Sequence, residues 1–574
     1  MMCSILGPEQ GWRRAGVLVL VGMSMALAPG CSMPERGPRR QAFGHDSPVY
    51  GGRFVFSAED DVRTLDPAVG YDSDSWNLEH LIFDTLLAYD DDVQLVPSLA
   101  SSWEVDERGL VYTFHLRDDV RFHTGRLMVA DDVVGSWNRL FDPALASPAT
   151  DFFGVIQGAD AVMEGRADRL SGLVALDPHT VQVTLDHPDS TFPNIVAMMF
   201  GAIIPPEVAA ELGDRFALTP VGTGPFQVTE RAVGEHTLLT AFDDFWQPGL
   251  PYLDEVEFLA GYPRSLAFMK LENDEIHEVD RLTSPDYLWL KHNPAWRRQL
   301  YEYPAVDTYG ELMNTEMPPF DDVWFRRAVS TAINRDKLRK LRNGRLRPTV
   351  SWVPPALPGF ADWDKLTPEE RADFQYQRYD PDLSRECLAK SRYADGLSEP
   401  LTYWAVDTEG SLVTAMSIQQ DLAAVGIPME LKLVTLSTYF TASGRRKTVP
   451  FAYAAWVMDF PHERNFLESR FHCRMISDEN STNDSFYCNP EVDALLDRAA
   501  RTMDEGQARE LYWQAHRIIA RDAPYAFEYH STALSVTQPY VKGFRAHPVY
   551  NRDMREAWLD LPEGRPTPDR GGAP

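Results

Sequence analysis

The segment Leu401–Pro461 constrains the fold of this chain more than any other segment. Its residue pattern predicts strands at Leu401–Ala405, Met429–Leu433 and Phe451–Trp456, with an amphipathic helix at Leu412–Val425 between the first two. The last of these strands is apolar enough to be buried. The order strand–helix–strand, followed by a further strand, predicts an open α/β sheet.

Asp459 lies just past the end of the last predicted strand. Ligands of open α/β sheets bind outside the carboxyl ends of the strands, so its position alone makes Asp459 a candidate binding residue. The alternative is a solvated or helix-capping carboxylate, because Pro461 indicates a turn immediately afterwards.

Residues 1–30 have the pattern of an export signal peptide. Arginines at positions 13 and 14 precede an uncharged apolar run, Ala15–Ala28. This run of about 14 residues is too short for a membrane-spanning helix, which needs roughly 20. It leads to Gly30-Cys31, which resembles the bacterial lipobox, whose Cys is lipidated and becomes the mature N-terminus. We therefore expect a lipid anchor on Cys31, with an ordinary secretory signal and an incidental Cys as the alternative.

Length and charge limit the possible partners. A chain of 574 residues is too long for one hydrophobic core, so two or three domains are expected. The formal net charge of −30 should repel nucleic acid, and no nucleic-acid partner is expected.

Three cysteines remain beyond the signal and the candidate anchor. Export permits disulfides, and Cys473 and Cys488 enclose a short loop of turn-prone residues, so we predict a bond between them. Cys387 lies in a helical pattern and is predicted to be a buried thiol. The histidines are scattered and there is no Cys-x-x-Cys pair, so neither a metal site nor another cofactor is expected.

Short blocks in a fixed order along the chain carry a family resemblance. They are Phe83–Leu87, Val96–Glu104, Tyr112–Arg117, Val120–Gly125, Ala130–Val133, Val221–Phe226, Pro319–Val323, Arg327–Ala328 and Ala332–Arg335. Together they resemble the bacterial extracellular solute-binding proteins of family 5, the peptide/nickel type, which includes dipeptide- and oligopeptide-binding proteins. The resemblance runs from about Gly51 to Phe544.

The resemblance implies an α/β architecture, the periplasmic-binding-protein fold of type II. Two α/β lobes would be joined by a hinge at crossovers near residues 303 and 526, with an additional inserted domain. The expected limits are 31–47 for a flexible tether, 48–82, 190–302 and 527–561 for lobe I, 83–189 for the inserted domain II, 303–526 for lobe III, and 562–574 for a disordered tail.

The resemblance also implies a function. The protein would be the substrate-binding lipoprotein of an ABC importer, monomeric and anchored outside the cytoplasm in the cell envelope. It would capture short peptides between its lobes and deliver them to a membrane permease with its ATPases. A non-peptide solute (an oligosaccharide, a metal chelate or heme) and a surface receptor without transport are the alternatives. An enzyme is not expected, because the chain contains no Gly-x-Ser-x-Gly, His-Glu-x-x-His or phosphate-loop motif.

In peptide-binding relatives, the Asp of a Trp-x-x-Asp motif pairs with the peptide's α-ammonium, and such a pair is strong in a closing cleft. The main chain just before that Asp could accept a peptide as an added strand. The opposing wall would be the segment 70–73, with a plain surface loop as the alternative. The predicted ligand-binding residues are Asp459, Trp456, Val457, Met458, Tyr71 and Ser73.

Two other features are predicted to be structural. Gly222-Thr223-Gly224 lacks the further Gly and the Lys of a phosphate loop, and Pro225 indicates a tight turn. His123 and His462 each stand alone beside charged residues, so solvated side chains are expected rather than ligands of a metal or heme.

Overall fold

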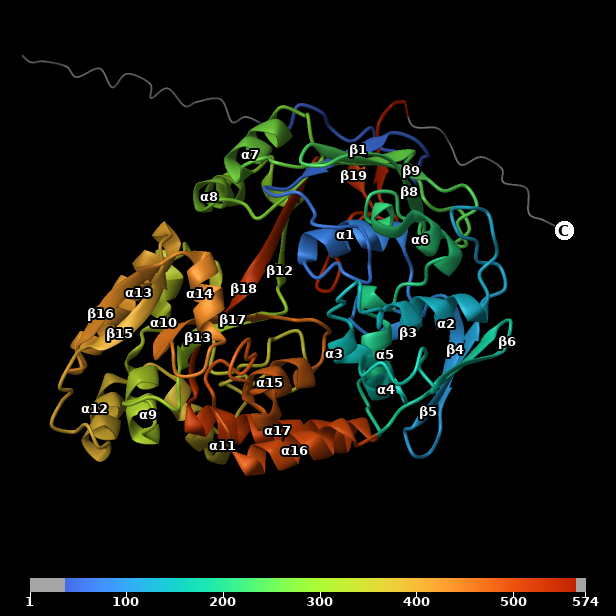
Figure 1. Ribbon diagram of the computed structural model, residues 1–574. Coiled ribbons are helices and arrows are strands. Elements are labelled where there is room, and N and C mark those ends of the chain that lie inside the picture. Colours follow the sequence, from blue (N-terminus) through green and yellow to red (C-terminus); the bar gives the residue numbers. More distant parts are fainter. Residues whose placement is uncertain (1–36, 564–574) are drawn as a thin grey trace, which may run out of the picture. The chain divides into compact units, whose positions relative to one another are not determined.

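The computed structural model describes residues 37–563 (Figure 1). The predicted signal peptide, Cys31, the first part of the tether and residues 564–574 of the tail lie outside the described residues. Within 37–563, no helix has both the length and the apolar character that crossing a bilayer requires.

One sheet of twelve strands extends through both lobes. Its order is β16-β15-β17-β13-β18-β11-β1-β10-β9-β8, and β12 and β14 also pair with β18. The strands are β1 (Arg53–Ser57), β8 (Phe226–Ala232), β9 (His236–Ala241), β10 (Glu255–Leu259), β11 (Glu278–Asp280), β12 (Leu300–Pro304), β13 (Asp307–Met313), β14 (Leu346–Pro348), β15 (Leu401–Val406), β16 (Met429–Val434), β17 (Phe451–Val457) and β18 (Tyr525–Thr537).

The long strand β18 connects the two lobes, and Figure 1 shows it in red between them. Its first half pairs with β13 of lobe III, where Tyr309 is opposite Tyr529, and its second half pairs with β12 and β11 of lobe I. The other connection is the short step from β12 to β13 through Ala305 and Val306.

The inserted domain has its own antiparallel sheet of order β4-β5-β7-β6. Trp137, Phe114 and Phe153 are fully buried in its core, which continues to Ile203, beyond the predicted limit at residue 189. Its elements are β2 (Leu87–Tyr89), β3 (Leu95–Pro97), β4 (Ala100–Val105), β5 (Val111–Leu116), β6 (Leu173–Asp177), β7 (Thr180–Thr184), α2 (Ala130–Arg139), α3 (Thr150–Phe153), α4 (Ala159–Met163) and α5 (Phe192–Val196).

Lobe III contains the predicted strand–helix–strand unit. Its helix α13 begins after Thr408, whose side chain accepts the Ser411 N–H, and its apolar stripe of Ala415, Ile418 and Leu422 is buried against the sheet. The helices of this lobe are α9 (Val323–Ala332), α10 (Arg335–Leu341), α11 (Pro368–Phe374), α12 (Pro381–Lys390), α13 (Glu409–Ala423), α14 (Leu436–Ser443), α15 (Glu463–Phe471), α16 (Pro490–Ala500) and α17 (Glu505–Asp522).

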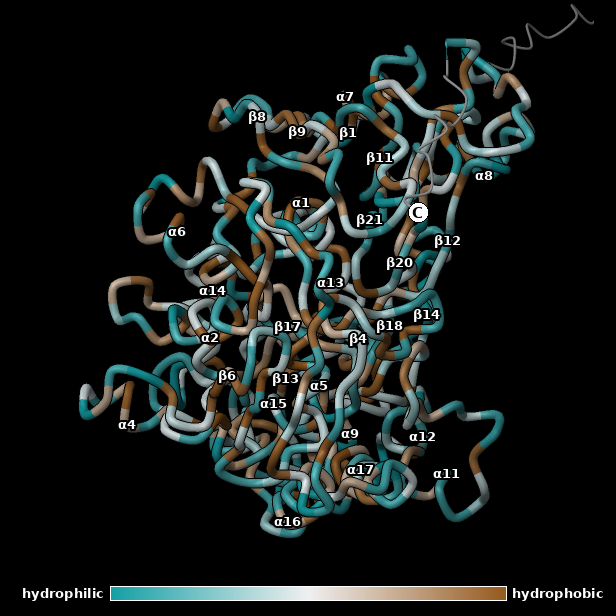
Figure 2. Tube along the Cα trace, turned by 90° about the vertical axis from the view of Figure 1, so that its right-hand side faces the viewer, coloured by the Kyte–Doolittle hydropathy of each residue, from teal (hydrophilic) through white to brown (hydrophobic). Residues whose placement is uncertain are grey.

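Hydrophobic stretches, brown in Figure 2, run through the strands around β13 and β17, and hydrophilic loops surround them. Cys387 of α12 is a buried free thiol in the lobe III core.

Lobe I contributes α1 (Ser73–Ile82), α6 (Pro206–Leu212), α7 (Arg264–Glu272), α8 (Ser284–His292) and the short strands β19 (Val541–Lys542), β20 (Arg545–His547), β21 (Asn551–Asp553) and β22 (Trp558–Leu559).

The described part of the predicted tether, residues 37–47, lies against lobe I. The main-chain N–H groups of Gly44 and His45 donate to the Asp560 carboxylate at 3.0 Å, and Arg40 forms an ion pair with Asp274 at 2.9 Å. Several hydrogen bonds therefore connect this segment to the end of the last strand.

Candidate ligand-binding site

The candidate site lies where β17 ends and α15 begins. The strand stops at Val457, and α15 starts at Glu463 after His462, whose Nδ1 accepts the Arg464 N–H at 3.1 Å as the helix cap. Asp459 lies in the short connection between these two elements, as the position after the buried strand predicts.

Asp459 is held by partners from both lobes. The Tyr71 hydroxyl of lobe I donates to Asp459 Oδ1 at 2.5 Å. The Asn465 amide donates to Asp459 Oδ2 at 2.7 Å, and its carbonyl oxygen accepts the Asp459 N–H at 2.9 Å and the Trp456 indole N–H at 3.2 Å. Asn465 therefore fixes the carboxylate relative to the strand end.

The environment of Asp459 favours a cationic partner. Burial raises the pKa of this carboxyl above its ordinary value, and the hydrogen bonds from Tyr71 and Asn465 offset only part of that effect. A positive group placed beside the carboxylate would stabilise its ionised form and would itself gain from the low local dielectric.

The opposing loop is shaped by local contacts at the start of α1. Asp72 caps the helix by accepting the Ser75 N–H at 2.9 Å, and the Trp76 indole N–H donates to the Gly70 carbonyl at 2.8 Å. A Cβ atom on Gly70 would lie 2.3 Å from a carboxyl oxygen of Glu79, so a larger residue there would require the Glu79 side chain to shift. These contacts direct Tyr71 toward lobe III.

Two adjoining cavities bring the predicted residues together. Tyr71, Ser73, Val457, Met458 and Asp459 line the first, of about 340 Å³. Trp456 lines a second cavity of about 480 Å³, which shares the Tyr71 and Asp459 side chains with the first. The six residues predicted from the sequence therefore line these two adjoining cavities between the lobes.

The carboxyl-terminal half of β17 has an open edge. β13 pairs with the strand along its whole length, whereas β15 pairs only with Phe451 and Ala452. The Met458 N–H donates to the Val306 carbonyl at 3.1 Å, so by strand alternation the main-chain groups of Ala455 and Val457 point away from β13. Within residues 37–563, no strand covers that side of residues 453–457.

The sequence pattern of the bacterial extracellular solute-binding proteins, family 5 (middle region), matches residues 94–478. The chain belongs to this family. Among its relatives, the di/tripeptide-binding protein 2 of Pseudomonas aeruginosa (strain UCBPP-PA14) is 28% identical over 500 residues, which cover 84% of this chain and 90% of that protein.

Two solved structures share the fold of this family 5 protein. The periplasmic binding protein DppA from Helicobacter pylori, in complex with the peptide STSA, aligns with a TM-score of 0.73 at 27% identity, covering 89% of this chain and 99% of that one. The clavulanic acid biosynthesis oligopeptide binding protein 2 aligns with a TM-score of 0.80 at 25% identity, covering 91% and 96%. The predicted periplasmic-binding-protein fold with an extra domain is thus confirmed.

Membership also decides the class of function. Family 5 proteins are non-catalytic solute-binding components of ABC transporters, so this chain binds a solute and is not an enzyme, as the absence of catalytic motifs predicted.

Sequence reasoning missed the ion pairs beside Asp459. Arg464 Nη1 donates to both carboxylate oxygens of Asp189 at 2.6 Å and to Thr191 Oγ1 at 2.8 Å, and its Nε donates to Glu468 at 2.7 Å. Asp189 belongs to the inserted domain and is 275 positions away in sequence, so no local pattern pointed to it. The sequence contains only a weak indication that Asn465 belongs to the site, namely that it is a polar residue in the first helical turn after Asp459.

The turn and the two histidines have structural roles. A Cβ atom on Gly222 would lie 2.1 Å from the Ile82 carbonyl oxygen, so the glycine allows close packing. One ring nitrogen of His123 accepts the Gly222 N–H, the other contacts the Gly224 carbonyl, and His462 caps α15.

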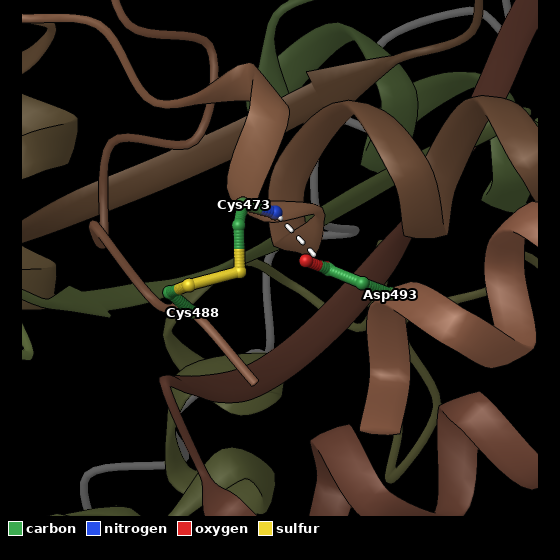
Figure 3. A group of neighbouring side chains, drawn as sticks. All are labelled: Cys473, Cys488 and Asp493. Carbon is green, nitrogen blue, oxygen red and sulfur yellow. Dashed lines mark hydrogen bonds between the residues drawn. A yellow bond between two sulfur atoms is a disulfide. The ribbon is translucent and has the colours of Figure 1, made fainter. Parts of the chain in front are cut away.

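Cys473, Cys488 and Asp493 form a compact group that does not suit a metal (Figure 3). The two sulfur atoms are joined in a disulfide, with Cα atoms 4.7 Å apart, and Asp493 accepts the Cys473 N–H at 3.0 Å. Oxidised sulfur lacks the thiolate that binds metal ions.

Proposed function

We propose that this solute-binding protein captures short peptides between its lobes and delivers them to the permease of an ABC importer. The observation that carries the proposal is Asp459, a carboxylate at the end of β17 that faces Tyr71 across the lobe junction. A peptide's α-ammonium would replace or join the Tyr71 hydroxyl as its partner.

The open edge of β17 supports the same proposal. A peptide lying along residues 453–457 would form main-chain hydrogen bonds with Ala455 and Val457, which do not depend on the peptide's side chains. The relatives include a di/tripeptide-binding protein and a protein whose structure holds the peptide STSA, and both agree with a peptide ligand.

Asp459→Ala tests the role of the carboxylate. Removing it would leave the ligand's cation unpaired in the closed cleft, which typically costs about 2–5 kcal/mol, or roughly 30- to 4000-fold in affinity. Asp459→Asn keeps the shape but loses the charge, so it should also bind weakly. Isothermal titration calorimetry with a co-purified peptide measures both variants.

N-acetylation of the same peptide removes the ammonium and should weaken binding to the wild type, whereas C-terminal amidation leaves the ammonium intact. The matched control is Asp395→Ala, an exposed aspartate of lobe III that lines neither cavity. Equal affinity for the free and acetylated peptides would refute the proposal and would indicate a non-peptide solute such as a sugar or a metal chelate.

We further propose that Cys31 carries a lipid that anchors the protein to a membrane, with the signal peptide removed before it. The support is the apolar run that ends at Gly30-Cys31. Intact mass measurement of protein from membranes should give a lipidated chain beginning at Cys31, and Cys31→Ala should move the protein to the soluble fraction. An unmodified N-terminus at another residue would contradict the proposal.

A further inference from the structure

The described part of the tether, residues 37–47, is held against lobe I from its first residue onward. A Cβ atom on Gly37 would lie 3.3 Å from the Ala295 Cβ, so these two residues are in contact. Arg39 Nη2 then donates to the side chain of Asn273, the C-cap of α7, at 2.6 Å. The tether therefore runs from the segment that follows α8 to the end of α7.

The number of residues between Cys31 and this contact limits where a bilayer can lie. Residues 31–36 separate the proposed lipid anchor from Gly37. Six residues span at most about 20 Å even when fully extended. A bilayer that holds the lipid must therefore face the part of lobe I around Ala295. At so short a reach, even a weak attraction between that surface and the bilayer acts as an intramolecular one.

One face of α8 carries exposed residues at the spacing i, i+3, i+4 and i+7. These residues, here called the α8 stripe, are Pro285, Leu288, Trp289 and His292. Leu288 and Trp289 are each 36% exposed, whereas Leu290 is fully buried. A helix that turns Leu and Trp outward on one face is typical of a helix that lies in a membrane interface.

α7 extends this apolar surface. It packs beside α8 (Figure 1), and the centroids of the Phe268 and Trp289 rings are 5.6 Å apart. Met269 of α7 is 57% exposed and lies one helical turn before Asn273, the residue that binds Arg39 of the tether. The exposed apolar side chains of α7 and α8 therefore adjoin the tether.

Two arginines near the α8 stripe lack an acidic partner, although the whole chain carries a net charge of −30. Arg297 and Arg298 are exposed, and within residues 37–563 neither forms an ion pair or a side-chain hydrogen bond. The acid beside the tether, Asp274, is already paired with Arg40 at 2.9 Å. Unpaired guanidinium groups beside exposed Trp and Leu suit the phosphates of anionic lipids.

We propose that the α8 stripe, with Arg297 and Arg298, is a docking surface for the anionic phospholipid headgroups of the bilayer that holds the protein's lipid. The inference rests on the proposed anchor at Cys31. Trp289 enters the boundary between headgroups and acyl chains, and the two arginines pair with lipid phosphates. The anchor then sets the orientation of the protein as well as its distance from the membrane, with lobe I toward the bilayer.

Chemical coupling tests this surface without relying on lipidation in the cell. The mature chain from Cys31, made without lipid, is attached through that thiol to vesicles that contain a maleimide lipid. Cys387 is buried and the Cys473–Cys488 pair is bonded, so neither competes for the maleimide. The vesicles consist of phosphatidylcholine with or without phosphatidylglycerol. Hydroxyl-radical footprinting with mass spectrometry then measures the oxidation of individual Trp and Met side chains.

On vesicles with phosphatidylglycerol, oxidation of Trp289 and Met269 should fall at least about threefold relative to the uncoupled chain, because lipid covers both side chains. Met163 of α4 and Met416 of α13 are internal controls of similar exposure, 50% and 52%. Their oxidation should not change.

Replacing the arginines tests the charge. Arg297→Glu together with Arg298→Glu should abolish the protection, because each arginine contributes roughly fivefold to the affinity for an anionic surface and glutamate reverses the charge. The matched control is Arg108→Glu with Arg166→Glu in the inserted domain, which changes the net charge equally. These two control side chains are 72% and 62% exposed, so their replacement should not disturb folding.

The outcomes separate the docking surface from the anchor. Unchanged oxidation of Trp289 and Met269 on coupled vesicles would overturn the surface, whatever native Cys31 carries. Protection of Met163 or Met416 instead would also overturn it, because another face would then lie on the bilayer. Equal protection on vesicles with and without phosphatidylglycerol would overturn the assignment to anionic headgroups. Native protein without lipid on Cys31 would refute the anchor, a failure that the coupled vesicles distinguish from failure of the surface.

Discussion

At the scale of single residues, the site depends on the hydrogen bonds that the two oxygens of the Asp459 carboxylate accept. One oxygen accepts from Tyr71 of lobe I, and the other accepts from Asn465 of lobe III, the lobe that contains Asp459 itself. Both donors favour the ionised form, but burial has the larger effect and raises the pKa of this carboxyl. The same burial raises the pKa of the Tyr71 hydroxyl, which therefore stays a donor.

The raised pKa of Asp459 predicts how binding depends on pH. An α-ammonium needs the ionised carboxylate, so affinity should fall as the pH decreases through that pKa, and the fall should begin above the ordinary aspartate value of 3.8. Calorimetry from about pH 7 to about pH 4 keeps the peptide's amine protonated throughout. Asp459→Asn should bind weakly at every pH, and a flat wild-type profile would contradict the role of Asp459.

At the scale of elements, the Cys473–Cys488 disulfide connects the end of α15 to the start of α16. The two residues are 15 positions apart, and the Asp493 side chain of α16 accepts the Cys473 N–H. Asn489, the residue after Cys488, caps α16 by accepting the Glu491 N–H at 3.0 Å. The bond therefore restricts the segment that leads from the candidate site back into the lobe III core.

Replacing both cysteines with alanine should lower the free energy of unfolding by about 3 kcal/mol, because an unlinked loop of this length gains entropy in the unfolded chain. Urea denaturation of the double variant and of the wild type measures the difference. In a chain that begins at Ser32, thiol counting under denaturing, non-reducing conditions should find only Cys387. Three reactive thiols would contradict the bond.

The strands and helices of lobe III could be predicted from the sequence because the signals that predict them are local. The strand predicted at Phe451–Trp456 is β17, Phe451–Val457, and the helix predicted at Leu412–Val425 is α13, Glu409–Ala423. Residue periodicity and caps act over a few positions. The approach of Asp189 to Arg464 and the lining of the cavities depend on how distant segments pack, which no local pattern records. Family resemblance, not periodicity, supplied Tyr71.

At the scale of the whole molecule, the lobes meet at several points around the candidate site. Arg464 of α15 contacts Asp189, the Ser190 N–H donates to the Ala500 carbonyl at 2.9 Å, and Phe460 is buried in the core of the inserted domain. Within the described residues 37–563, two segments connect lobes I and III covalently: β18 and the step from β12 to β13. A ligand that touches both sides would favour the state in which these contacts form.

Closure by ligand therefore predicts a smaller radius of gyration in small-angle scattering when peptide saturates the protein. Arg464→Ala removes a pair whose side chains are only 15% and 4% exposed, and it should make closure less favourable. Apparent affinity scales with the population of the closed, binding-competent state. For Arg464→Ala, the peptide concentration that gives half of the decrease in radius of gyration should therefore rise about 10-fold or more, and saturating peptide should still give the compact form.

Arg166→Ala is the matched control, since the Arg166–Glu164 pair lies within the inserted domain and both of its side chains are 62% exposed. An unchanged scattering curve for the wild type at saturating peptide would refute the hinge. If Arg464→Ala and Arg166→Ala needed the same peptide concentration for half of the compaction, the Asp189–Arg464 pair would not contribute to closure.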